Sequence, residues 1–221
     1  MARGGATLVV FDCDGTLVDG QSAICDAMET AFAAAELPAP ERNQVRRIVG
    51  LSLPQAIARL APNGSPECHS RALESYKTSF RAARIEGRLE EPLYPGIADL
   101  LHRLAAAGRK LGVATGKSDR GLNSCLGHHG LSEMFVTLQT ADRHPSKPHP
   151  AMLEAALFEA GVPHENAVMI GDTVFDMAMA SAIGVRAIGV SWGYHEPAEL
   201  LAAGAVGVAE TAEELESLID G

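Results

Sequence analysis

Two acidic residues follow an apolar run near the start of the chain. In "VVFDCDGTLVD" (9–19), Asp12 and Asp14 come directly after a predicted buried strand, and Gly15 and Thr16 follow them. Burying an unpaired carboxylate is strongly unfavourable, so two of them at such a strand end need either a bound cation or a solvated turn. Asp and Gly are common in turns, and this pair alone does not decide between the two.

Other polar residues stand where further apolar runs end. They are Thr115 and Gly116 at the end of "KLGVATG", Asp172 after "AVMIG" with Asp176 four residues later, and Lys147 in the loop "SKPHP". In an open α/β sheet, ligands bind at the carboxyl ends of the strands. We therefore expect these acids, the hydroxyl and the lysine to converge, although they are far apart in the sequence.

The elements that must position these residues alternate along the chain. Continuous apolar runs, typical of strands buried on both faces, span 7–11, 110–115, 135–140, 167–171 and 185–190, with a weaker one at 205–209. The segments between them have helical periodicity, as in "GIADLLHRLAAAG" (96–108), where the apolar residues fall on one face. The alternation predicts an α/β fold with a doubly wound, Rossmann-like parallel sheet.

One stretch departs from this alternation. Between about Gly20 and Gly87 only helical patterns occur, at 22–36, 41–49, 53–60 and 66–86. We interpret residues 18–87 as an inserted α-helical cap domain, and residues 1–17 and 88–221 as a discontinuous core domain. The connections near 17–21 and 86–94 are candidate hinges.

Composition narrows the class of protein and its partners. Of 221 residues, 47% are hydrophobic and 21% charged, which is ordinary for a folded globular chain. The net charge of −10 argues against nucleic acid as a partner but leaves room for a small phosphorylated metabolite in a locally positive pocket.

Cysteine spacing and apolar runs bear on the compartment. The four cysteines form no C-x-x-C pair, which favours a reduced, cytoplasmic chain over a zinc or disulfide protein. The N-terminal apolar stretch is too short for a signal sequence, and no run is long enough to span a membrane. We expect no membrane partner, and no sequence feature specifies an oligomeric state.

Four short motifs, taken in order, resemble those of the haloacid dehalogenase-type phosphatases. They are "DCDGT", "ATGK", "SKPHP" and "GDTVFD", and together they cover nearly the whole chain. A helical insertion between the first and second motifs is what the small-cap class of this family has. The resemblance implies a Rossmann-like fold and an enzyme that hydrolyses phosphoric monoesters with Mg²⁺ as cofactor.

The resemblance also implies roles for the acids. Asp12 corresponds to the nucleophile that forms an aspartyl-phosphate, and Asp14 to the general acid and base. The Mg²⁺ ligands would be Asp12, the backbone carbonyl of Asp14, and Asp172, with Asp176 as a direct ligand or acting through water. We expect the carboxylates near Asp14 to raise its pKa.

Phosphate binding falls to residues of the first three motifs. By resemblance, Thr115 and the backbone amides around Gly15 and Gly116 bind the phosphoryl oxygens, and Lys147 steadies both the nucleophile and the developing charge. Relatives often carry Asn where this chain has Gly116.

In the small-cap class, residues of the cap help to determine which substrate binds. Arg47 and Gly50 are our candidates for such residues. The basic residues of the 66–86 helix, Arg71, Lys77, Arg81 and Arg84, are interpreted as a solvated face.

Sibling activities can be compared with these motifs. Asp14 argues against a dehalogenase, and no lysine lies between Val18 and Met28 for phosphonatase chemistry. Sugar phosphomutases usually have an arginine soon after the cap glycine, whereas Gly50 is followed here by Leu51-Ser52-Leu53, which disfavours a mutase. The remaining resemblance is to the phosphoglycolate phosphatase-like branch, with phosphoglycolate as the leading substrate. Inorganic pyrophosphate, a sugar phosphate, phosphotransfer by a phosphomutase, and a non-catalytic module that binds phospho-ligands stay open as alternatives.

Overall fold

The computed structural model describes residues 6–221 and contains one parallel sheet. Within that range six strands pair in the order β3-β2-β1-β4-β5-β6. Their bounds are β1 Leu8–Phe11, β2 Lys110–Thr115, β3 Thr137–Thr140, β4 Ala167–Gly171, β5 Arg186–Val190 and β6 Val208–Ala209. The predicted doubly wound, Rossmann-like sheet is confirmed. Residues 1–5 of the predicted core segment lie outside the described residues.

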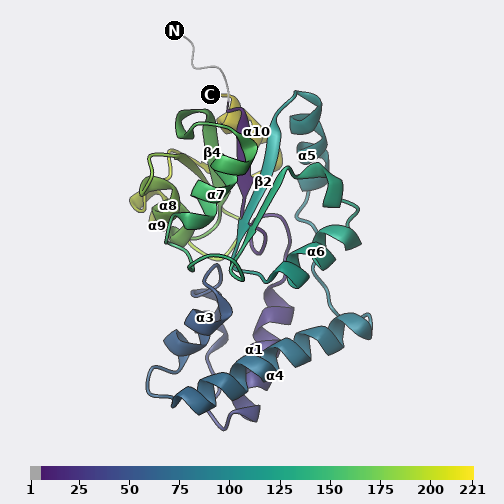
Figure 1. The fold of residues 1–221 in the computed structure, drawn as a ribbon, viewed down its shortest axis with the longest axis vertical. Coiled ribbons are helices and arrows are strands. Elements are labelled where there is room, and N and C mark those ends of the chain that lie inside the picture. Colours follow the sequence, from purple (N-terminus) through teal and green to yellow (C-terminus); the bar gives the residue numbers. More distant parts are fainter. Residues whose placement is uncertain (1–5) are drawn as a thin grey trace.

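Helices cover both faces of this sheet (Figure 1). They are α5 Ile97–Ala106, α6 Asp119–His128, α7 Ala151–Ala160, α8 Val174–Ser181, α9 Pro197–Ala202 and α10 Ala212–Asp220, with short 3₁₀ turns η1 Ser132–Met134 and η2 His164–Asn166. Val9 and Phe11 of β1 pack with α5, α6 and α10, whereas Leu8 and Val10 pack with α7, α8 and α9. Because successive strand side chains point to opposite faces, a continuous apolar run is buried on both sides.

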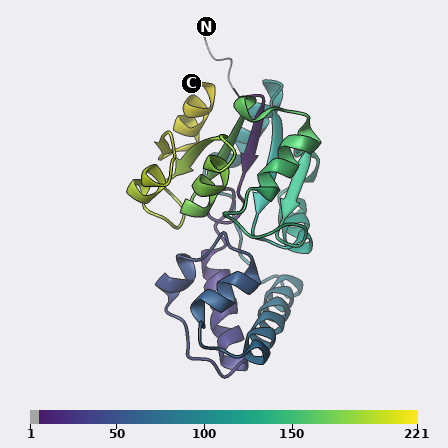
Figure 2. The same cartoon turned by 60° about the vertical axis from the view of Figure 1, so that its left-hand side comes forward.

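The inserted segment is helical, and it lies beyond one end of the sheet (Figures 1 and 2). Its helices are α1 Gln21–Ala34, α2 Arg42–Arg46, α3 Leu53–Leu60 and α4 Pro66–Ile85. It has an apolar cluster of its own, which includes Met28, Phe32 and Ile57. We call these four helices and their loops the helical cap. The exact domain boundaries at 17/18 and 87/88 stay a prediction.

Two connections join the helical cap to the sheet, and they run side by side. The Asp19 amide donates to the Pro92 carbonyl at 2.8 Å, and the Tyr94 amide donates to the Leu17 carbonyl at 3.0 Å. These bonds tie the two candidate hinges together close to the end of β1.

None of the helices in residues 6–221 is both long and apolar enough to cross a bilayer.

Candidate active site at the carboxyl edge of the sheet

Asp12 lies where central strand β1 ends, between β2 and β4. Its amide donates to the Ile170 carbonyl at 2.9 Å, which continues the hydrogen bonding of β1 to β4 by one residue. Its carboxylate is buried. Oδ1 lies 3.0 Å from the Lys147 Nζ, whereas Oδ2 has no hydrogen-bond partner among the described residues. One oxygen is thus held in place, and the other is available to a ligand.

Lys147 is a fully buried cation between two carboxylates. Besides Asp12, its Nζ contacts Asp176 Oδ1 at 2.6 Å. Burial lowers the pKa of Lys147, but Asp12 and Asp176 outweigh that effect and hold the pKa above its ordinary value. The ammonium group therefore stays charged and fixes both acids.

Asp176 is also tied to the start of α8. Its Oδ2 accepts from the Thr173 amide at 3.2 Å and from the Thr173 hydroxyl at 2.7 Å. This is a capping box, in which the third residue of a helix bonds back to the N-cap residue. Both carboxylate oxygens of Asp176 already have partners, so its position is set by the helix start.

Three buried acids gather at this point. Oxygens of Asp12, Asp172 and Asp176 lie within 4.8 Å of one another. Asp172 accepts from the Thr16 hydroxyl and from the Tyr194 amide, each at 2.9 Å. Burial raises the pKa of Asp12 to about 7, against the opposing effect of Lys147. Burial, Asp12 and Asp176 raise the pKa of Asp172 well above its ordinary value.

These residues fit a hard divalent cation. Lys147 contacts Asp12 and Asp176, and among residues 6–221 no other cationic side chain pairs with any of the three acids, which leaves an excess of buried negative charge. The donor set is all oxygen, and Asp12 Oδ2 is a buried acceptor with no partner. Hard cations such as Mg²⁺ prefer such ligands.

Asp14 lies in the loop that follows β1, two residues after Asp12. Its Oδ1 is 2.9 Å from the Lys117 Nζ. Its pKa is raised as expected, but burial is the largest cause, opposed by Lys117 and increased by Glu91. The carboxylate that raises the pKa of Asp14 is therefore that of Glu91, which lies far away in the sequence.

Two glycines make room for close packing around these acids. Gly15 has φ +83°, and a Cβ there would lie 2.1 Å from Asp172 Oδ2. At Gly116 a Cβ would lie 2.6 Å from the Leu51 carbonyl oxygen of the helical cap. The Asn that the family resemblance suggests at position 116 has no room here, because the cap backbone occupies the space. Thr115, beside Gly116, is buried.

A cavity of about 910 Å³ separates the helical cap from the carboxyl ends of the strands. Asp12, Asp14, Thr115, Gly116 and Gly50 all line it. Lys147, Asp172 and Asp176 are fully buried and do not line it. The structure thus brings the predicted acids, hydroxyl and lysine to one edge of the sheet, where Asp12, Asp14 and Thr115 line a cavity large enough for a small molecule.

Comparison with known proteins agrees with this arrangement. The sequence model of the protein family of haloacid dehalogenase-like hydrolases matches residues 9–190. The chain belongs to this family. The family resemblance is confirmed, and the chain is a phosphatase of the haloacid dehalogenase-like hydrolases, an enzyme that acts on phosphate esters.

Individual relatives in this hydrolase family align over most of their length. The chain is 36% identical over 199 residues to the probable phosphatase IndB of Dickeya dadantii, covering 89% of this chain and 86% of the relative. It is 34% identical over 205 residues to a phosphoglycolate phosphatase of Rhodospirillum rubrum, covering 90% and 85%. A crystal structure of a predicted phosphatase from Clostridium acetobutylicum superposes with TM-score 0.86 at 27% identity, covering 97% and 98% of the two chains.

One residue that sequence reasoning assigned to this hydrolase's substrate site lies elsewhere. The Arg47 guanidinium makes two contacts of 2.5 Å with Glu199 of α9, and its carbonyl oxygen is 3.2 Å from His195 Nε2. Arg47 does not line the cavity. The acidic partner that holds it belongs to the core, about 150 residues further on, and local sequence gives no sign of it.

Three basic residues of α4 face the cavity of the hydrolase. Lys77, Arg81 and Arg84 line it, together with Arg120 of α6. Lys77 and Arg81 are exposed to solvent, as predicted for this helix, although both also line the cavity, and Arg84 is half-buried.

Several residues that hold the site were missed. Lys117 and Glu91 surround Asp14, and Thr16 and Tyr194 bond to Asp172. Lys117 could have been predicted from the sequence, because it comes two residues after the end of β2 and so lies at the edge of the sheet where ligands bind. Glu91 and Tyr194 lie in loops whose local sequence specifies no contact.

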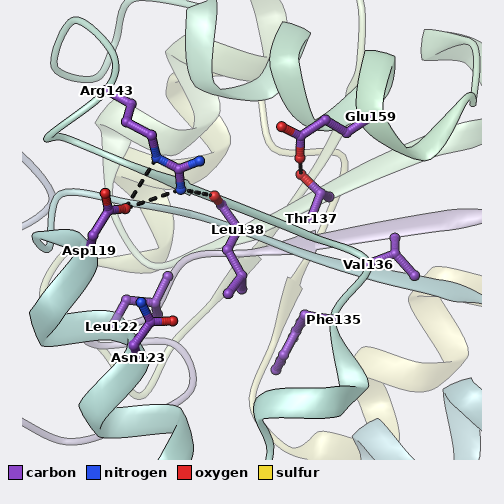
Figure 3. Close-up of a pocket in the computed structure, with 9 residues that line it drawn as sticks. All are labelled: Asp119, Leu122, Asn123, Phe135, Val136, Thr137, Leu138, Arg143 and Glu159. Carbon is purple, nitrogen blue, oxygen red and sulfur yellow. Dashed lines mark hydrogen bonds and ion pairs between the residues drawn. The ribbon is translucent and has the colours of Figure 1, made fainter.

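A second hollow, of about 330 Å³, lies along edge strand β3 (Figure 3). Four of its polar side chains pair with one another: Arg143 pairs with Asp119, and the Thr137 hydroxyl donates to Glu159 at 2.6 Å. None of the acids gathered around Lys147 lines it, whereas Asp12 lines the larger cavity.

Proposed function

We propose that this chain is a Mg²⁺-dependent phosphatase that hydrolyses a small organic phosphate monoester through an aspartyl-phosphate, with phosphoglycolate as the leading substrate. The observation that carries the proposal is the carboxylate of Asp12, with Oδ1 fixed by Lys147 and Oδ2 without a partner, at the edge of a cavity. A carboxylate held in this way is prepared to attack phosphorus.

In the first step an oxygen of Asp12 attacks the phosphorus of the ester. A bond forms between that oxygen and phosphorus, and the bond from phosphorus to the leaving alkoxide breaks. Asp14 donates a proton to the leaving oxygen. Lys147 stays beside Asp12, and Thr115 with the amides around Gly15 and Gly116 would bind the phosphoryl oxygens.

In the second step water hydrolyses the aspartyl-phosphate. Asp14, now ionised, takes a proton from the water as it attacks phosphorus, which releases inorganic phosphate and restores the Asp12 carboxylate. The same residue thus serves as acid in one step and base in the next.

Asp12, Asp172 and the Asp14 carbonyl would hold Mg²⁺, with Asp176 as a direct ligand or acting through water. When bound, Mg²⁺ supplies positive charge that offsets repulsion between the anionic nucleophile and the phosphate. The free Oδ2 of Asp12 and the excess of buried carboxylates support this assignment.

Two observations bear on the substrate. Arg81 and Arg120 line the cavity, and neither has an acidic partner within 4.0 Å in the described part of the chain, so they suit a second anionic group such as the carboxylate of phosphoglycolate. The similarity to the Rhodospirillum rubrum phosphoglycolate phosphatase supports the same choice. The cavity volume, larger than phosphoglycolate needs, favours a sugar phosphate as the second candidate.

The test is phosphate release from p-nitrophenyl phosphate, phosphoglycolate, pyrophosphate and sugar phosphates, with Mg²⁺ or with chelator. We expect Mg²⁺-dependent turnover that Asp12→Asn abolishes in a chain that stays folded, and the highest kcat/KM on phosphoglycolate. A phosphorylated acceptor in place of free phosphate would indicate a phosphomutase. A folded wild-type chain without turnover on any of these esters contradicts the proposal.

A further inference from the structure

A second buried charge network surrounds Asp14. Lys117 Nζ lies 2.9 Å from Asp14 Oδ1 and 2.6 Å from Glu91 Oε1, and Arg84 Nη2 lies 3.1 Å from Glu91 Oε2. The side chains of Lys117, Asp14 and Glu91 are only 8%, 12% and 7% exposed. Charges this deeply buried are held in defined positions, because an alternative position would leave them without a partner.

The members of this network come from four separate parts of the fold. Asp14 follows β1, Lys117 follows β2, Glu91 lies in the second connection, and Arg84 lies near the end of α4. The Phe80 ring lies under both cations, with its centroid 5.7 Å from Lys117 Nζ and 5.7 Å from Arg84 Cζ. The network thus lies where cap, connection and sheet meet.

Glu91 is itself fixed by the core. Its carbonyl oxygen is 2.8 Å from His129 Nε2, and the neighbouring Pro92 carbonyl accepts from the Asp19 amide. Glu91 therefore holds Lys117 from a backbone that is anchored on both sides.

Asp14 needs such support. In the part of the chain that the structure describes, Lys117 is the one cationic side chain within 4.0 Å of its carboxylate. Proton transfer to a leaving group requires the carboxyl oxygen to lie within hydrogen-bond reach of it, so the orientation of Asp14 affects the rate directly.

We propose that Lys117, held by Glu91, is a positioning residue that orients the Asp14 carboxyl group for proton transfer to the leaving group. The inference rests on the proposed phosphatase chemistry and extends it to two residues outside the four motif acids and Lys147.

Leaving-group dependence separates this role from a structural one. p-Nitrophenolate is a stable anion and departs without a proton, whereas an alkoxide needs one. The kcat/KM of both esters reports the transfer of phosphate to Asp12. A residue that orients Asp14 should therefore matter for an alkyl ester and hardly at all for the aryl ester.

The experiment compares kcat/KM of wild type and Lys117→Met on p-nitrophenyl phosphate and on phosphoglycolate, or glucose 6-phosphate should phosphoglycolate not be hydrolysed. We expect a loss of about 10- to 100-fold on the alkyl ester, which is part of a full general-acid effect. On the aryl ester we expect a loss of less than about 3-fold. Glu91→Gln should change the ratio of kcat/KM on the aryl ester to kcat/KM on the alkyl ester in the same direction as Lys117→Met, but by less. Lys117→Arg should lie closer to the wild-type ratio than Lys117→Met does.

Lys110→Met is the matched control. Lys110 is the first residue of β2, at the end of the strand away from Lys117, and its Nζ donates to the Ala160 carbonyl at 2.6 Å. Its aryl-to-alkyl ratio should equal that of wild type. In an Asp14→Asn background, Lys117→Met should cause no further loss, because the residue it orients is gone.

Equal losses on both esters, or a full additional loss in the Asp14→Asn background, would overturn the assignment. A wild type inactive on both esters would contradict the proposed function instead. A crystal structure of Lys117→Met then decides the positioning role without any activity: an Asp14 carboxylate turned away from its wild-type position supports it, and an unmoved carboxylate refutes it.

Discussion

At the scale of single residues, the site is organised by buried pairs of opposite charge. Lys147 pairs with Asp12 and Asp176, and Lys117 pairs with Asp14 and Glu91. The sequence allowed the prediction of Asp12, Asp14, Lys147 and Asp172 as site residues, because each stands at a strand end or in a motif. It did not allow the prediction of Glu91, whose contact depends on how two distant connections pack.

Removing Lys147 should destabilise the folded chain, because the buried acids would lose their cationic partner. We expect Lys147→Met to destabilise the metal-free chain by about 3 kcal/mol or more, since breaking a buried ion pair leaves uncompensated charge. Mg²⁺ should restore part of that stability by pairing with the same acids. Thermal unfolding with chelator and with Mg²⁺ measures both effects. Equal midpoints for mutant and wild type in chelator would contradict this prediction.

Glu159, beside the second hollow, should make stability depend on pH. Hydrogen bonds from Thr137, and then Gln139, hold the pKa of Glu159 below its usual value of 4.5. The folded chain thus releases this proton more readily than the unfolded chain, so the contribution to stability is fully present above pH 4.5 and is lost as pH falls through the lower, folded pKa.

Glu159→Gln should therefore lower the unfolding temperature most at neutral pH. Because the side chain is exposed, we expect a difference of only about 1–3 °C, shrinking as the pH approaches 4 and below. Melting curves of mutant and wild type at pH 7, 5 and 4 check it. A difference that grows toward acid pH would show that the sign is wrong.

At the scale of elements, the sequence predicted central strands better than edges. Strands β2 and β4 match the predicted 110–115 and 167–171, because they are buried on both faces and give continuous apolar runs. Edge strand β6 has only Val208–Ala209 of the predicted 205–209, since a single neighbour pairs with it.

The predicted helix at 41–49 illustrates what the pattern could not show. Helix α2 ends at Arg46, because the following segment docks on the core. There Arg47 pairs with Glu199, and the Ser52 amide donates to the Ser146 hydroxyl at 2.7 Å. Tertiary contacts thus override the local periodicity.

The docked segment explains Gly116 and makes a prediction about it. We expect Gly116→Asn, which introduces the residue common among relatives, to push the Leu51 carbonyl away, raise KM about 10-fold and lower stability by about 1–3 kcal/mol, the range for overpacking. Gly127→Asn is the control, since a Cβ there meets only the Ser132 hydroxyl oxygen, at an ordinary contact distance of 3.8 Å. Steady-state kinetics and thermal unfolding measure both variants. Wild-type behaviour of Gly116→Asn would refute the steric account.

At the scale of the whole molecule, the cavity lies between two parts joined by paired connections. Asp19 and Pro92, and Leu17 and Tyr94, bond across these connections next to Asp14. This arrangement favours rotation of the helical cap as one unit, because both hinges lie on the same side of the site. Contacts such as that of Arg47 with Glu199 would change in such a motion, and they escaped sequence reasoning because they join distant segments.

We expect the helical cap to close over a bound phosphate mimic. Small-angle X-ray scattering with Mg²⁺ and orthovanadate should give a smaller radius of gyration than with Mg²⁺ alone. Asp12→Asn, which lacks the nucleophile for the mimic, serves as the comparison. Superimposable scattering curves for wild type in the two conditions would contradict cap closure.

The central place of β1 has a consequence for biosynthesis. One neighbour of this strand, β2, begins about 100 residues later, and the other, β4, begins at Ala167. At a translation rate of roughly 5–20 residues per second, the ribosome needs on the order of ten seconds or more to deliver β4 after β1 has been made. Throughout that time an apolar strand waits without its second partner, and only the emergence of β4 lets the nascent chain enclose Asp12.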